Sequence, residues 1–425
     1  MMNWTPLLHE ALLQGGQVRI DSRKVANGDL FFALKGDRFN ANDFVEEVLT
    51  KAPSWVVMDE DRGLKDSRII IVDDALTALQ EFARYHRQQL KIPVIGLTGS
   101  NGKTTSKELF HAVLSQKYKV SSTVGNLNNH IGVPLTILGI RPDHEIAVVE
   151  MGANAQKEIA FLCSVSQPDI GYITNFGLAH LEGFGGPEGV VKGKSELYDY
   201  LRAHHKRAIV FADAPRQIEK STGIERTLFG SQASAPYQFT SGAELPYFQL
   251  TYEGRSIQTQ LSGGYNFSNV AAAITMGLLF NVPLEQIVEG IEKYQPTNNR
   301  SQKQQTDRNA LIIDCYNANP SSMELALRSL SLHPGQRMAI LGDMFEMGEY
   351  EKEEHQRIAE LAQTLGIENR LFVGDAFYEH ADSRETRVRT TDEAMAYLKA
   401  NPPRDCTILL KGSRGMTLEK LIPLL

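Results

Sequence analysis

The stretch Val94-Ile-Gly-Leu-Thr-Gly-Ser-Asn-Gly-Lys-Thr-Thr105 decides the fold of this chain. Apolar residues 93–97 predict a buried strand and residues 103–116 have a helical pattern, so the Gly-rich turn between them has the context of a phosphate-binding loop. Gly99 and Gly102 let backbone amides face phosphate oxygens, and the helix dipole points at the same place. We expect the whole loop to contact a nucleoside triphosphate: Thr98, Gly99, Ser100, Asn101, Gly102, Lys103, Thr104 and Thr105.

Two residues of this loop carry its chemistry. In such loops the lysine, here Lys103, reaches the β- and γ-phosphates, and the hydroxyl of the next residue, Thr104, binds Mg²⁺. Leu97 stands where the general G-x-x-x-x-G-K-[ST] pattern has its first glycine. The alternative is a turn that binds no ligand, and the complete strand and helix context favours the nucleotide site.

The composition of the 425 residues is that of a soluble globular protein, with 42% hydrophobic and 22% charged residues. This length allows about two to four domains, each with its own core. No stretch approaches the ~20 apolar residues of a membrane span, so we expect no membrane insertion. Residues 1–6 have neither a basic region nor a long apolar one, which argues against a secretory signal. We therefore expect a cytoplasmic protein.

Charge and cysteine usage exclude two further classes. The net charge of −7 argues against a nucleic-acid binder, which normally carries a basic stripe. Cys163, Cys315 and Cys406 lie far apart and have no metal-ligand spacing, so we expect them in or near the core. We expect a monomer that binds small molecules.

The hydrophobic pattern predicts an α/β protein of three domains. Residues 1–90 form a small α/β domain with short strands at 30–34, 55–58 and 68–72 and a helix at 75–90. Residues 91–302 form a P-loop ATPase domain whose sheet is mostly parallel, with an antiparallel flap at 225–262. Residues 303–425 form a Rossmann-like domain. The polar segment 296–308 is predicted to be a linker.

Two polar residues follow predicted strands of the central domain. Glu150 closes the strand 146–150, and His180 comes shortly after the strand 170–174. Open α/β sheets bind ligands at the carboxyl ends of their strands, which favours a functional position over a surface one. Glu150 could complete the shell of an Mg²⁺ ion held by Thr104 and two phosphates.

At this point the sequence resembles a known family. The loop 98–105, with leucine in place of the first glycine, is similar to the ATP loop of the Mur ligases, the amide-forming enzymes of peptidoglycan assembly. Further motifs resemble the branch that adds D-alanyl-D-alanine: 126–134, 314–320, 341–344 with Glu346 and Gly348, and 411–414. The Asp-Asn-Pro-Arg motif of the diaminopimelate-adding relatives is absent.

The resemblance implies a reaction that joins a carboxylate to an amine with ATP. The carboxylate of UDP-N-acetylmuramoyl-tripeptide attacks the γ-phosphate and gives an acyl phosphate and ADP, and the amine of D-alanyl-D-alanine then displaces phosphate. Phosphoryl transfer depends mostly on positioning and charge neutralisation. The resemblance gives this role to Lys103, Thr104 and Glu150 with one Mg²⁺, and to His180 with a second Mg²⁺.

A carbamylated lysine is also implied by the resemblance, at Lys194. A lysine that has lost its proton can take up CO₂ and become a carboxylate able to order the second Mg²⁺, which requires a lowered amine pKa. Without the resemblance, a solvated lysine on a charged helix would be the preferred interpretation. Lys192, on the same predicted helix, is the alternative position.

The resemblance implies further nucleotide contacts. Asn266 and Asn269 match residues that approach the adenine, although Tyr265 replaces the usual histidine and Asn266 could instead cap a helix. Arg300 matches an arginine near the phosphates. Asp314 is expected to face the nucleotide as the third domain closes and excludes water from the acyl phosphate.

Substrate contacts are expected in all three domains. Ser22 and Arg23 are similar to residues that hold the UDP end, although a turn stabilised by Asp21 is the competing interpretation. The remaining amides could also serve turns. Those expected near the muramoyl-peptide are Asn126, Asn128 and Asn129, and those expected near D-alanyl-D-alanine are Asn317 and Asn319.

Two other functions stay open from the sequence. One is a Mur ligase that adds a different amino acid, or a polyglutamate-adding relative, and the motifs of the third domain argue against both. The other is a binding protein in which the P-loop drives a conformational change without ligation. In that case His180 and Lys194 would have no purpose.

Overall fold

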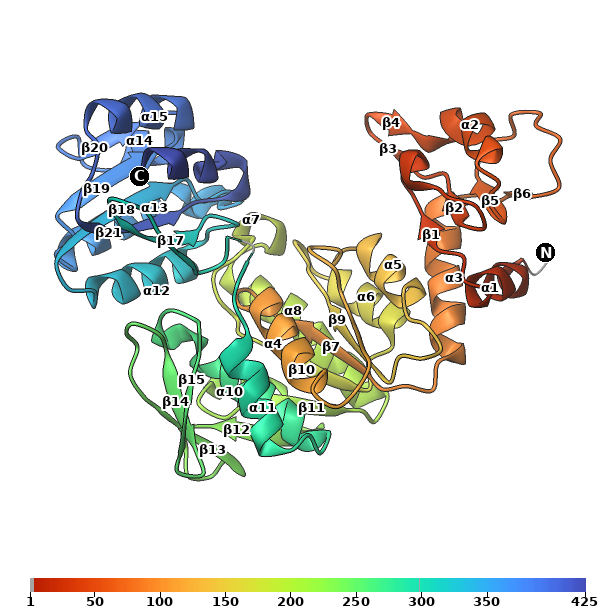
Figure 1. Ribbon diagram of the computed structural model, residues 1–425, viewed down its shortest axis with the longest axis horizontal. Helices are drawn as coiled ribbons and strands as arrows, with labels where there is room; N and C mark the ends of the chain where they lie inside the picture. Colours follow the sequence, from red (N-terminus) through yellow and green to blue (C-terminus); the bar gives the residue numbers. More distant parts are fainter. Residues whose placement is uncertain (1–3, 298) are drawn as a thin grey trace.

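The computed structural model describes residues 4–297 and 299–425. It is an α/β structure built around three large sheets, as the hydrophobic pattern predicts. The central sheet lies between the N-terminal and C-terminal parts, which occupy opposite ends of the molecule (Figure 1). In the part of the chain that the structure describes, no helix combines the length and apolar character needed to cross a membrane.

The N-terminal sheet is parallel and has the order β1-β2-β5-β6. Its strands are β1 (Val18–Arg19), β2 (Leu30–Phe32), β5 (Trp55–Met58) and β6 (Ile69–Ile71). A small hairpin accompanies it, formed by β3 (Lys35–Gly36) and β4 (Phe39–Asn40). The helical segments of this part are α1 (Thr5–Leu13), η1 (Ser22–Lys24), η2 (Ala41–Phe44), α2 (Val45–Thr50) and α3 (Ala75–Gln89).

Helix α3 belongs to two cores at once. It begins at Asp74, whose side chain accepts a hydrogen bond of 2.6 Å from the Thr77 amide. The helix packs against α1 and β2 of the N-terminal part and also against α5 (Gly132–Leu138) and α6 (Glu158–Ser166) of the central part. Its buried Phe82 lies in the same hydrophobic cluster as Phe32 and Leu162. The N-terminal and central parts therefore share this helix.

The central sheet has nine strands in the order β15-β14-β13-β12-β11-β10-β7-β9-β8. Neighbours from β8 to β13 pair in parallel, and β13, β14 and β15 pair antiparallel. The strands are β7 (Val94–Thr98), β8 (Val120–Ser122), β9 (Ile146–Glu150), β10 (Ile170–Ile173), β11 (Arg207–Phe211), β12 (Glu225–Gly230), β13 (Tyr237–Ser241), β14 (Gln249–Tyr252) and β15 (Arg255–Gln258).

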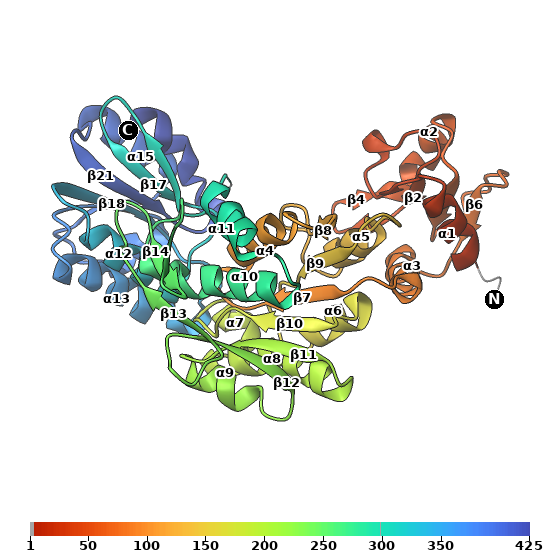
Figure 2. The ribbon, with the colours of Figure 1, turned by 60° about the horizontal axis from the view of Figure 1, so that its bottom comes forward.

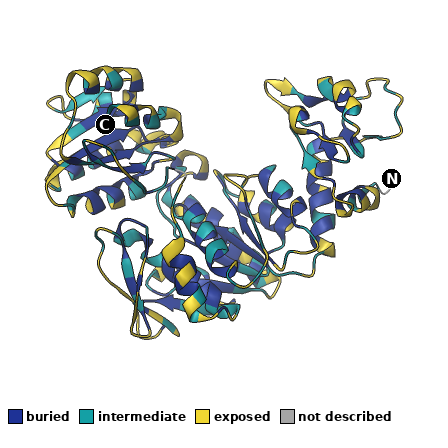
Figure 3. Ribbon diagram, viewed as in Figure 1, coloured by how far each residue is buried: buried dark blue, intermediate teal, exposed yellow. Residues whose placement is uncertain are grey.

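Helices cover both faces of the central sheet (Figure 2). Alternate residues of β7 face opposite cores: Ile95 contacts the cluster under α4, α10 and α11, whereas Val94 contacts the cluster under α3, α5, α6 and α8. Strands β7 and β9 are buried along their whole length, and burial on both faces explains why their sequences are nearly continuous apolar runs (Figure 3). The remaining helical segments are α4 (Lys103–Leu114), α7 (Leu181–Phe184), α8 (Pro187–Ala203), α9 (Pro215–Lys220), η3 (Gly264–Asn266), α10 (Phe267–Leu279) and α11 (Leu284–Lys293).

The C-terminal sheet has the order β16-β17-β21-β18-β19-β20 and is parallel except for β16. Its strands are β16 (Gln302–Gln305), β17 (Ala310–Asp314), β18 (Gln336–Gly342), β19 (Asn369–Val373), β20 (Thr386–Val388) and β21 (Cys406–Lys411). Its helical segments are α12 (Pro320–Ser331), η4 (Gly348–Tyr350), α13 (Glu351–Thr364), α14 (Asp375–His380), α15 (Thr391–Ala400), η5 (Arg414–Met416) and η6 (Leu418–Leu424).

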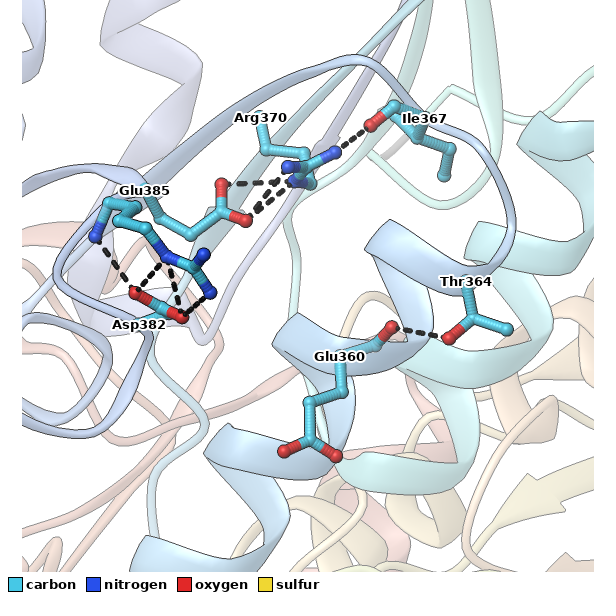
Figure 4. A network of polar contacts seen from close by, with 7 residues as sticks. Glu360, Thr364, Ile367, Arg370, Asp382 and Glu385 are labelled. Atoms are coloured by element: carbon cyan, nitrogen blue, oxygen red, sulfur yellow. Dashed lines mark hydrogen bonds and ion pairs between the residues drawn. The ribbon is translucent and has the colours of Figure 1, made fainter.

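An ion pair ties the outer strands of this sheet together. Arg370 of β19 donates to Glu385, which precedes β20, at 2.8 Å, and it also contacts the Ile367 carbonyl (Figure 4). Both charged side chains are mostly buried. The pair therefore fixes the far edge of the sheet, away from β17.

Two predictions about local structure were wrong. The polar segment 296–308 contains a strand, because β16 pairs with β17 along its whole length and closes the sheet edge. The flap predicted at 225–262 is antiparallel only in part, because β12 and β13 extend the parallel sheet before the chain reverses into β14.

Candidate active site at the junction of the central and C-terminal sheets

A cavity of about 770 Å³ lies where the carboxyl ends of β7, β9 and β10 meet the C-terminal sheet. Most of the residues predicted from the sequence line it. From the central part these are Ser100, Asn101, Gly102, Lys103, Thr105, Asn126, Asn128, Asn129, Glu150, His180, Asn266 and Asn269. From the linking segment and the C-terminal part they are Arg300, Asp314, Asn317 and Asn319.

The phosphate-binding loop has the backbone that its glycines predict. Gly99 and Gly102 have φ angles of 141° and 81°, which residues with a side chain rarely adopt. A Cβ atom at Gly102 would lie 2.6 Å from Asn269 Oδ1, and one at Gly99 would collide with the Thr174 hydroxyl. Only glycine fits either position, and α4 begins directly after the loop.

Two cations converge on this loop. Lys103 Nζ donates hydrogen bonds of 2.7 and 3.1 Å to the carbonyls of Gly99 and Ser100. Burial, together with the nearby charge of Arg300, lowers the pKa of Lys103 to about 8. Arg300 Nε is buried and has no hydrogen-bond partner among the described residues, although the guanidinium carbon lies 3.7 Å from the centre of the Tyr316 ring. An unpaired donor beside a second cation suits a phosphate ligand.

Thr104 and Glu150, which the sequence predicts as oxygen ligands of Mg²⁺, contact each other. The Thr104 hydroxyl donates to Glu150 Oε2 at 3.0 Å, and Asn128 Nδ2 donates to Glu150 Oε1 at 2.8 Å. Both Thr104 and Glu150 are buried. The described residues contain no cluster of three or more His, Cys, Asp and Glu side chains able to hold a metal. This donor set fits an Mg²⁺ ion that takes its other ligands from phosphate and water.

His180 lies at the start of α7 and points toward the C-terminal part. Its backbone is in the left-handed region, with a φ angle of 54°. Its Nδ1 atom contacts the Glu346 carboxylate, and this contact holds the pKa of Glu346 below its usual range. His180 therefore lines the cavity, and Glu346 of the C-terminal part contacts its imidazole ring.

Lys194 of α8 is completely buried, so the interpretation as a solvated lysine is wrong. Its Nζ atom donates a hydrogen bond of 2.9 Å to the carbonyl of Ala153, a residue that lines the cavity. Burial lowers its pKa well below the usual range. Lys194 itself does not line the cavity, and Lys192 on the same helix is exposed. Of the two lysines considered from the sequence, only Lys194 therefore has the burial that a lowered amine pKa requires.

The asparagines expected near the base bond to each other. Asn269 Nδ2 donates to Asn266 Oδ1 at 3.0 Å, and Asn269 Oδ1 accepts from the Ser106 hydroxyl at 3.0 Å. Asn266 occupies the position before α10, but its side chain makes no capping hydrogen bond. Tyr265 stands where the family has a histidine. Its hydroxyl is 2.8 Å from the Ser301 hydroxyl, so this side chain contacts the segment that links the central and C-terminal parts.

The C-terminal residues of the cavity are anchored by the end of β17. Asp314 accepts from Lys411 Nζ at 2.5 Å and from the Ser301 amide at 3.1 Å. Asn319 caps α12: its side chain accepts from the Ser322 amide at 3.0 Å, and Pro320 follows at the first helical position. Asn319 therefore has a structural role as a helix cap and not in a turn, and the same side chain also bonds to Asn101 of the P-loop.

Ser22 and Arg23 lie in the N-terminal part and do not line the cavity. The turn predicted as the competing interpretation is present, because Asp21 accepts from the Arg23 amide at 3.1 Å and from Arg23 Nε at 2.9 Å. The neighbouring guanidinium lowers the pKa of Asp21 to about 2. Thr98, Gly99 and Thr104 are buried and do not line the cavity.

Several residues that line the cavity were not predicted from the sequence. They follow β9 and lie in or near α12 and include Ala153, Asn154, Gln156, Lys157, Glu158, Phe161, Tyr316 and Leu325. The segment after β9 could have been found, because it follows Glu150 at the same edge of the sheet. Leu325, on one face of α12, gives no such signal.

Comparisons with known proteins agree with this arrangement. The Mur ligase middle domain family matches residues 97–277, and the Mur ligase glutamate ligase domain family matches residues 299–414. The chain is 32% identical to the UDP-N-acetylmuramoyl-tripeptide--D-alanyl-D-alanine ligase of Bacillus subtilis, with 98% of this chain and 94% of that protein covered. It is 34% identical to the ligase of the same name from Escherichia coli, over 96% of this chain and 94% of that protein.

Solved structures extend the likeness to the whole architecture. A crystal structure of MurF from Acinetobacter baumannii superposes with a TM-score of 0.87 at 32% identity and covers 99% of this chain and 97% of that one. The structure of the Thermotoga maritima MurF ligase in complex with ADP has a TM-score of 0.86 at 25% identity and covers 98% of this chain and 97% of that one. The chain belongs to the Mur ligase family, in the branch of the UDP-N-acetylmuramoyl-tripeptide:D-alanyl-D-alanine ligases, MurF.

Proposed function

We propose that the protein is an ATP-dependent, ADP-forming ligase that adds D-alanyl-D-alanine to UDP-N-acetylmuramoyl-tripeptide in peptidoglycan precursor synthesis. One observation carries the proposal beyond family membership: a single cavity is lined by the P-loop, by Glu150 and by the C-terminal amides Asn317 and Asn319. Nucleotide and acceptor can therefore meet in one cavity.

The first half of the reaction activates the tripeptide carboxylate. A carboxylate is a poor electrophile, so it attacks the γ-phosphate and becomes an acyl phosphate, with ADP as the leaving group. Lys103 and Arg300 bring positive charge to the phosphates, and Thr104 and Glu150 would hold an Mg²⁺ ion that, when bound, would neutralise charge on the transferring group. Asn266 and Asn269 contact the adenine.

The second half transfers the acyl group to the dipeptide. The neutral amine of D-alanyl-D-alanine attacks the acyl carbon, a tetrahedral intermediate forms, and phosphate leaves with the bonding electrons while the nitrogen loses a proton. Asn317 and Asn319 hold the dipeptide, and Asp314 closes over the nucleotide. Exclusion of water by the C-terminal domain protects the acyl phosphate from hydrolysis.

Lys194 and His180 serve a second Mg²⁺ in this proposal. The uncharged amine of Lys194 adds CO₂ and releases a proton, which converts the buried neutral amine into a negatively charged carbamate. Complete burial and the lowered pKa support this, because only the neutral amine is a nucleophile. The hydrogen bond to Ala153, which lines the cavity, supports an orientation toward the site. When bound, the ion would reduce the repulsion between the tripeptide carboxylate and the γ-phosphate.

The long donor substrate extends from the cavity to the N-terminal domain. Asn126, Asn128 and Asn129 contact the muramoyl-peptide, and Ser22 and Arg23 contact the UDP end. In this division, residues 1–90 bind the UDP end, 91–302 bind ATP, and 303–425 form the mobile Rossmann-like domain. A monomeric state and a cytoplasmic location stay predictions.

The test follows phosphate release from ATP and Mg²⁺ with UDP-N-acetylmuramoyl-tripeptide, with and without D-alanyl-D-alanine, and the mass of the UDP-linked product. Release that needs both substrates and yields the pentapeptide mass is the expected result. Release that is indifferent to the dipeptide would favour a nucleotide-switched binding protein instead. A product with a single added amino acid would indicate a different acceptor.

A further inference from the structure

The Glu346 loop, residues 343–350 between β18 and α13, carries a sequence motif that the proposed function leaves without a role. It contacts α7 of the central part (Figure 1). The Glu182 amide donates to the Glu346 carbonyl at 3.2 Å, and the Glu346 carboxylate contacts His180 Nδ1. Backbone and side chain of Glu346 thus both engage the segment that carries His180.

The C-terminal core holds this loop in place. The Met344 amide donates to His355 Nε2 at 3.0 Å, and the Phe345 amide donates to the Ser413 hydroxyl at 2.9 Å. His355 and Ser413 are both buried. The position of Glu346 is therefore set by the C-terminal sheet and not by the flexibility of an exposed loop.

Both partners of the contact have an unusual backbone. His180 and Glu346 have φ angles of 54° and 60°, in the left-handed region that disfavours side chains other than glycine. Gly348, two residues after Glu346, has a φ angle of 55°, and a Cβ there would lie 3.2 Å from Glu182 Cβ. Such conformations persist where the surrounding structure enforces them, and they are frequent at functional sites.

The chemistry of the pair follows from the atom that is contacted. A carboxylate only accepts hydrogen bonds, so a neutral His180 must carry its proton on Nδ1 to bond to Glu346. Nε2 then keeps its lone pair, which is the form in which imidazole binds metals. Histidine ligands typically donate their other N–H to a carboxylate, which fixes the tautomer and the ring orientation.

We propose that Glu346 is a positioning residue, supplied by the C-terminal domain, that holds His180 in the Nδ1–H tautomer with Nε2 available to the second Mg²⁺. The metal part rests on the proposed function of His180, whereas the tautomer part does not. Docking of the C-terminal domain and preparation of the metal ligand would then be one event. The alternative is that Glu346 only stabilises the contact between the C-terminal and central parts and has no effect on the tautomer of His180.

The experiment compares Glu346→Ala and Glu346→Gln with Glu349→Gln, a matched change at an exposed position of the same loop. Long-range ¹H–¹⁵N spectra of histidine-labelled protein, without substrates, report the tautomer, and loss of a signal in His180→Gln assigns it. We expect the Nδ1–H form in the unmodified protein, in Glu349→Gln and in Glu346→Gln, whose amide oxygen still accepts. We expect the Nε2–H form to dominate in Glu346→Ala.

The second measurement is the Mg²⁺ concentration for half-maximal ligation. It should rise about 10-fold in Glu346→Ala and stay within about twofold of the unmodified value in Glu349→Gln, while the KM for ATP is unchanged. An unchanged tautomer in Glu346→Ala, in a protein that still ligates, would overturn the inference alone. A lower Mg²⁺ requirement would also overturn it, because Glu346 would then be blocking His180. Absence of ligation in the unmodified protein would contradict the proposed function. The tautomer could still be determined, because that measurement requires no substrates.

Discussion

The side-chain amides of Asn101 and Asn319 pair with each other between the P-loop and the start of α12. Asn319 Nδ2 donates to Asn101 Oδ1 at 2.7 Å, and Asn101 Nδ2 donates to Asn319 Oδ1 at 3.3 Å. A second bond lies beside them, from the Leu178 amide to the Ser321 hydroxyl at 2.9 Å. The P-loop is thus in direct contact with the start of α12, the helix that begins at the end of the 314–320 motif.

Asn319→Asp should uncouple this contact while preserving the helix cap. The carboxylate still accepts from the Ser322 amide, but it cannot donate to Asn101 Oδ1 and places two oxygens face to face. We expect a fall of about 10-fold in kcat/KM for ligation, about 1.4 kcal/mol, with little change in the melting temperature. A matched control is Thr390→Ala, which removes the cap of α15 far from the cavity and should cost about 1 kcal/mol of stability without loss of activity. Unchanged ligation kinetics in Asn319→Asp would show that the pair only packs.

Lys103→Ala should abolish ligation without unfolding the protein. The side chain is the central cation of the loop, and removing a group that stabilises developing charge typically costs about 100- to 1000-fold in rate. Circular dichroism and the melting temperature should be close to those of the unmodified protein. Lys117→Ala, which removes an exposed lysine soon after the same helix, is the control and should ligate normally. Normal turnover in purified Lys103→Ala would remove the phosphate site from the mechanism.

Lys194→Ala should lose ligation and regain part of it with added formate or acetate. A short carboxylate can occupy the space of the proposed carbamate, whereas Lys192→Ala, at an exposed position of α8, should not require an added carboxylate for activity. Carbon-13 NMR with labelled bicarbonate provides a direct measurement, because a carbamate signal should be present in the unmodified protein and in Lys192→Ala and absent in Lys194→Ala. Equal activity of both variants, with no carbamate signal in the unmodified protein, would leave Lys194 a buried structural lysine.

His86 should make the protein sensitive to acid. It is buried on α3, its Nε2 atom is 3.1 Å from the Ile140 carbonyl, and its Nδ1 atom is 3.1 Å from His9 Nε2. Burial lowers its pKa from 6.5 to about 4. Between these values the unfolded chain binds the proton more readily, so this contribution to stability is complete above pH 6.5 and is lost as the pH falls toward 4. Its size is roughly 3 kcal/mol.

Thermal unfolding measured from pH 4 to pH 7 checks this prediction. The melting temperature of His86→Gln should fall less steeply with acid than that of the unmodified protein, because glutamine does not titrate. His205→Gln, at an exposed position, should follow the unmodified curve. Parallel curves for His86→Gln and the unmodified protein would assign the acid sensitivity to other groups.

The sequence predicts the fold well wherever burial is two-sided. Residues 94–98 and 146–150 are apolar runs because both faces of those strands are covered, and the strands lie where the runs predict them. Strand β16 escaped prediction because Gln-Lys-Gln-Gln at 302–305 has no apolar pattern, and its pairing depends on the free edge of β17. The parallel pairing of β12 likewise depends on a distant neighbour, β11.

The residues of the candidate site likewise fall into those that local sequence predicts and those that depend on distant contacts. The P-loop and Glu150 are local features, visible as a motif and as a strand end. The contact of His180 with Glu346 joins residues that are 166 positions apart, and no local pattern records it. The burial of Lys194 was also hidden, because its helix carries exposed charges on other faces and the residues that cover it, such as Phe184, come from a different element.

The shared helix α3 has a consequence for how the donor is chosen. Because α3 is packed into the cores on both sides, it acts as a rigid spacer between the N-terminal sheet and the central one. In the proposed binding mode, the uridine end of the donor lies on one side of this spacer and the phosphates of ATP lie on the other. The spacer then sets the distance that the donor must span. A peptide stem that is one residue too short or too long would place its carboxylate away from the γ-phosphate, so selection by length requires no recognition of each residue along the stem.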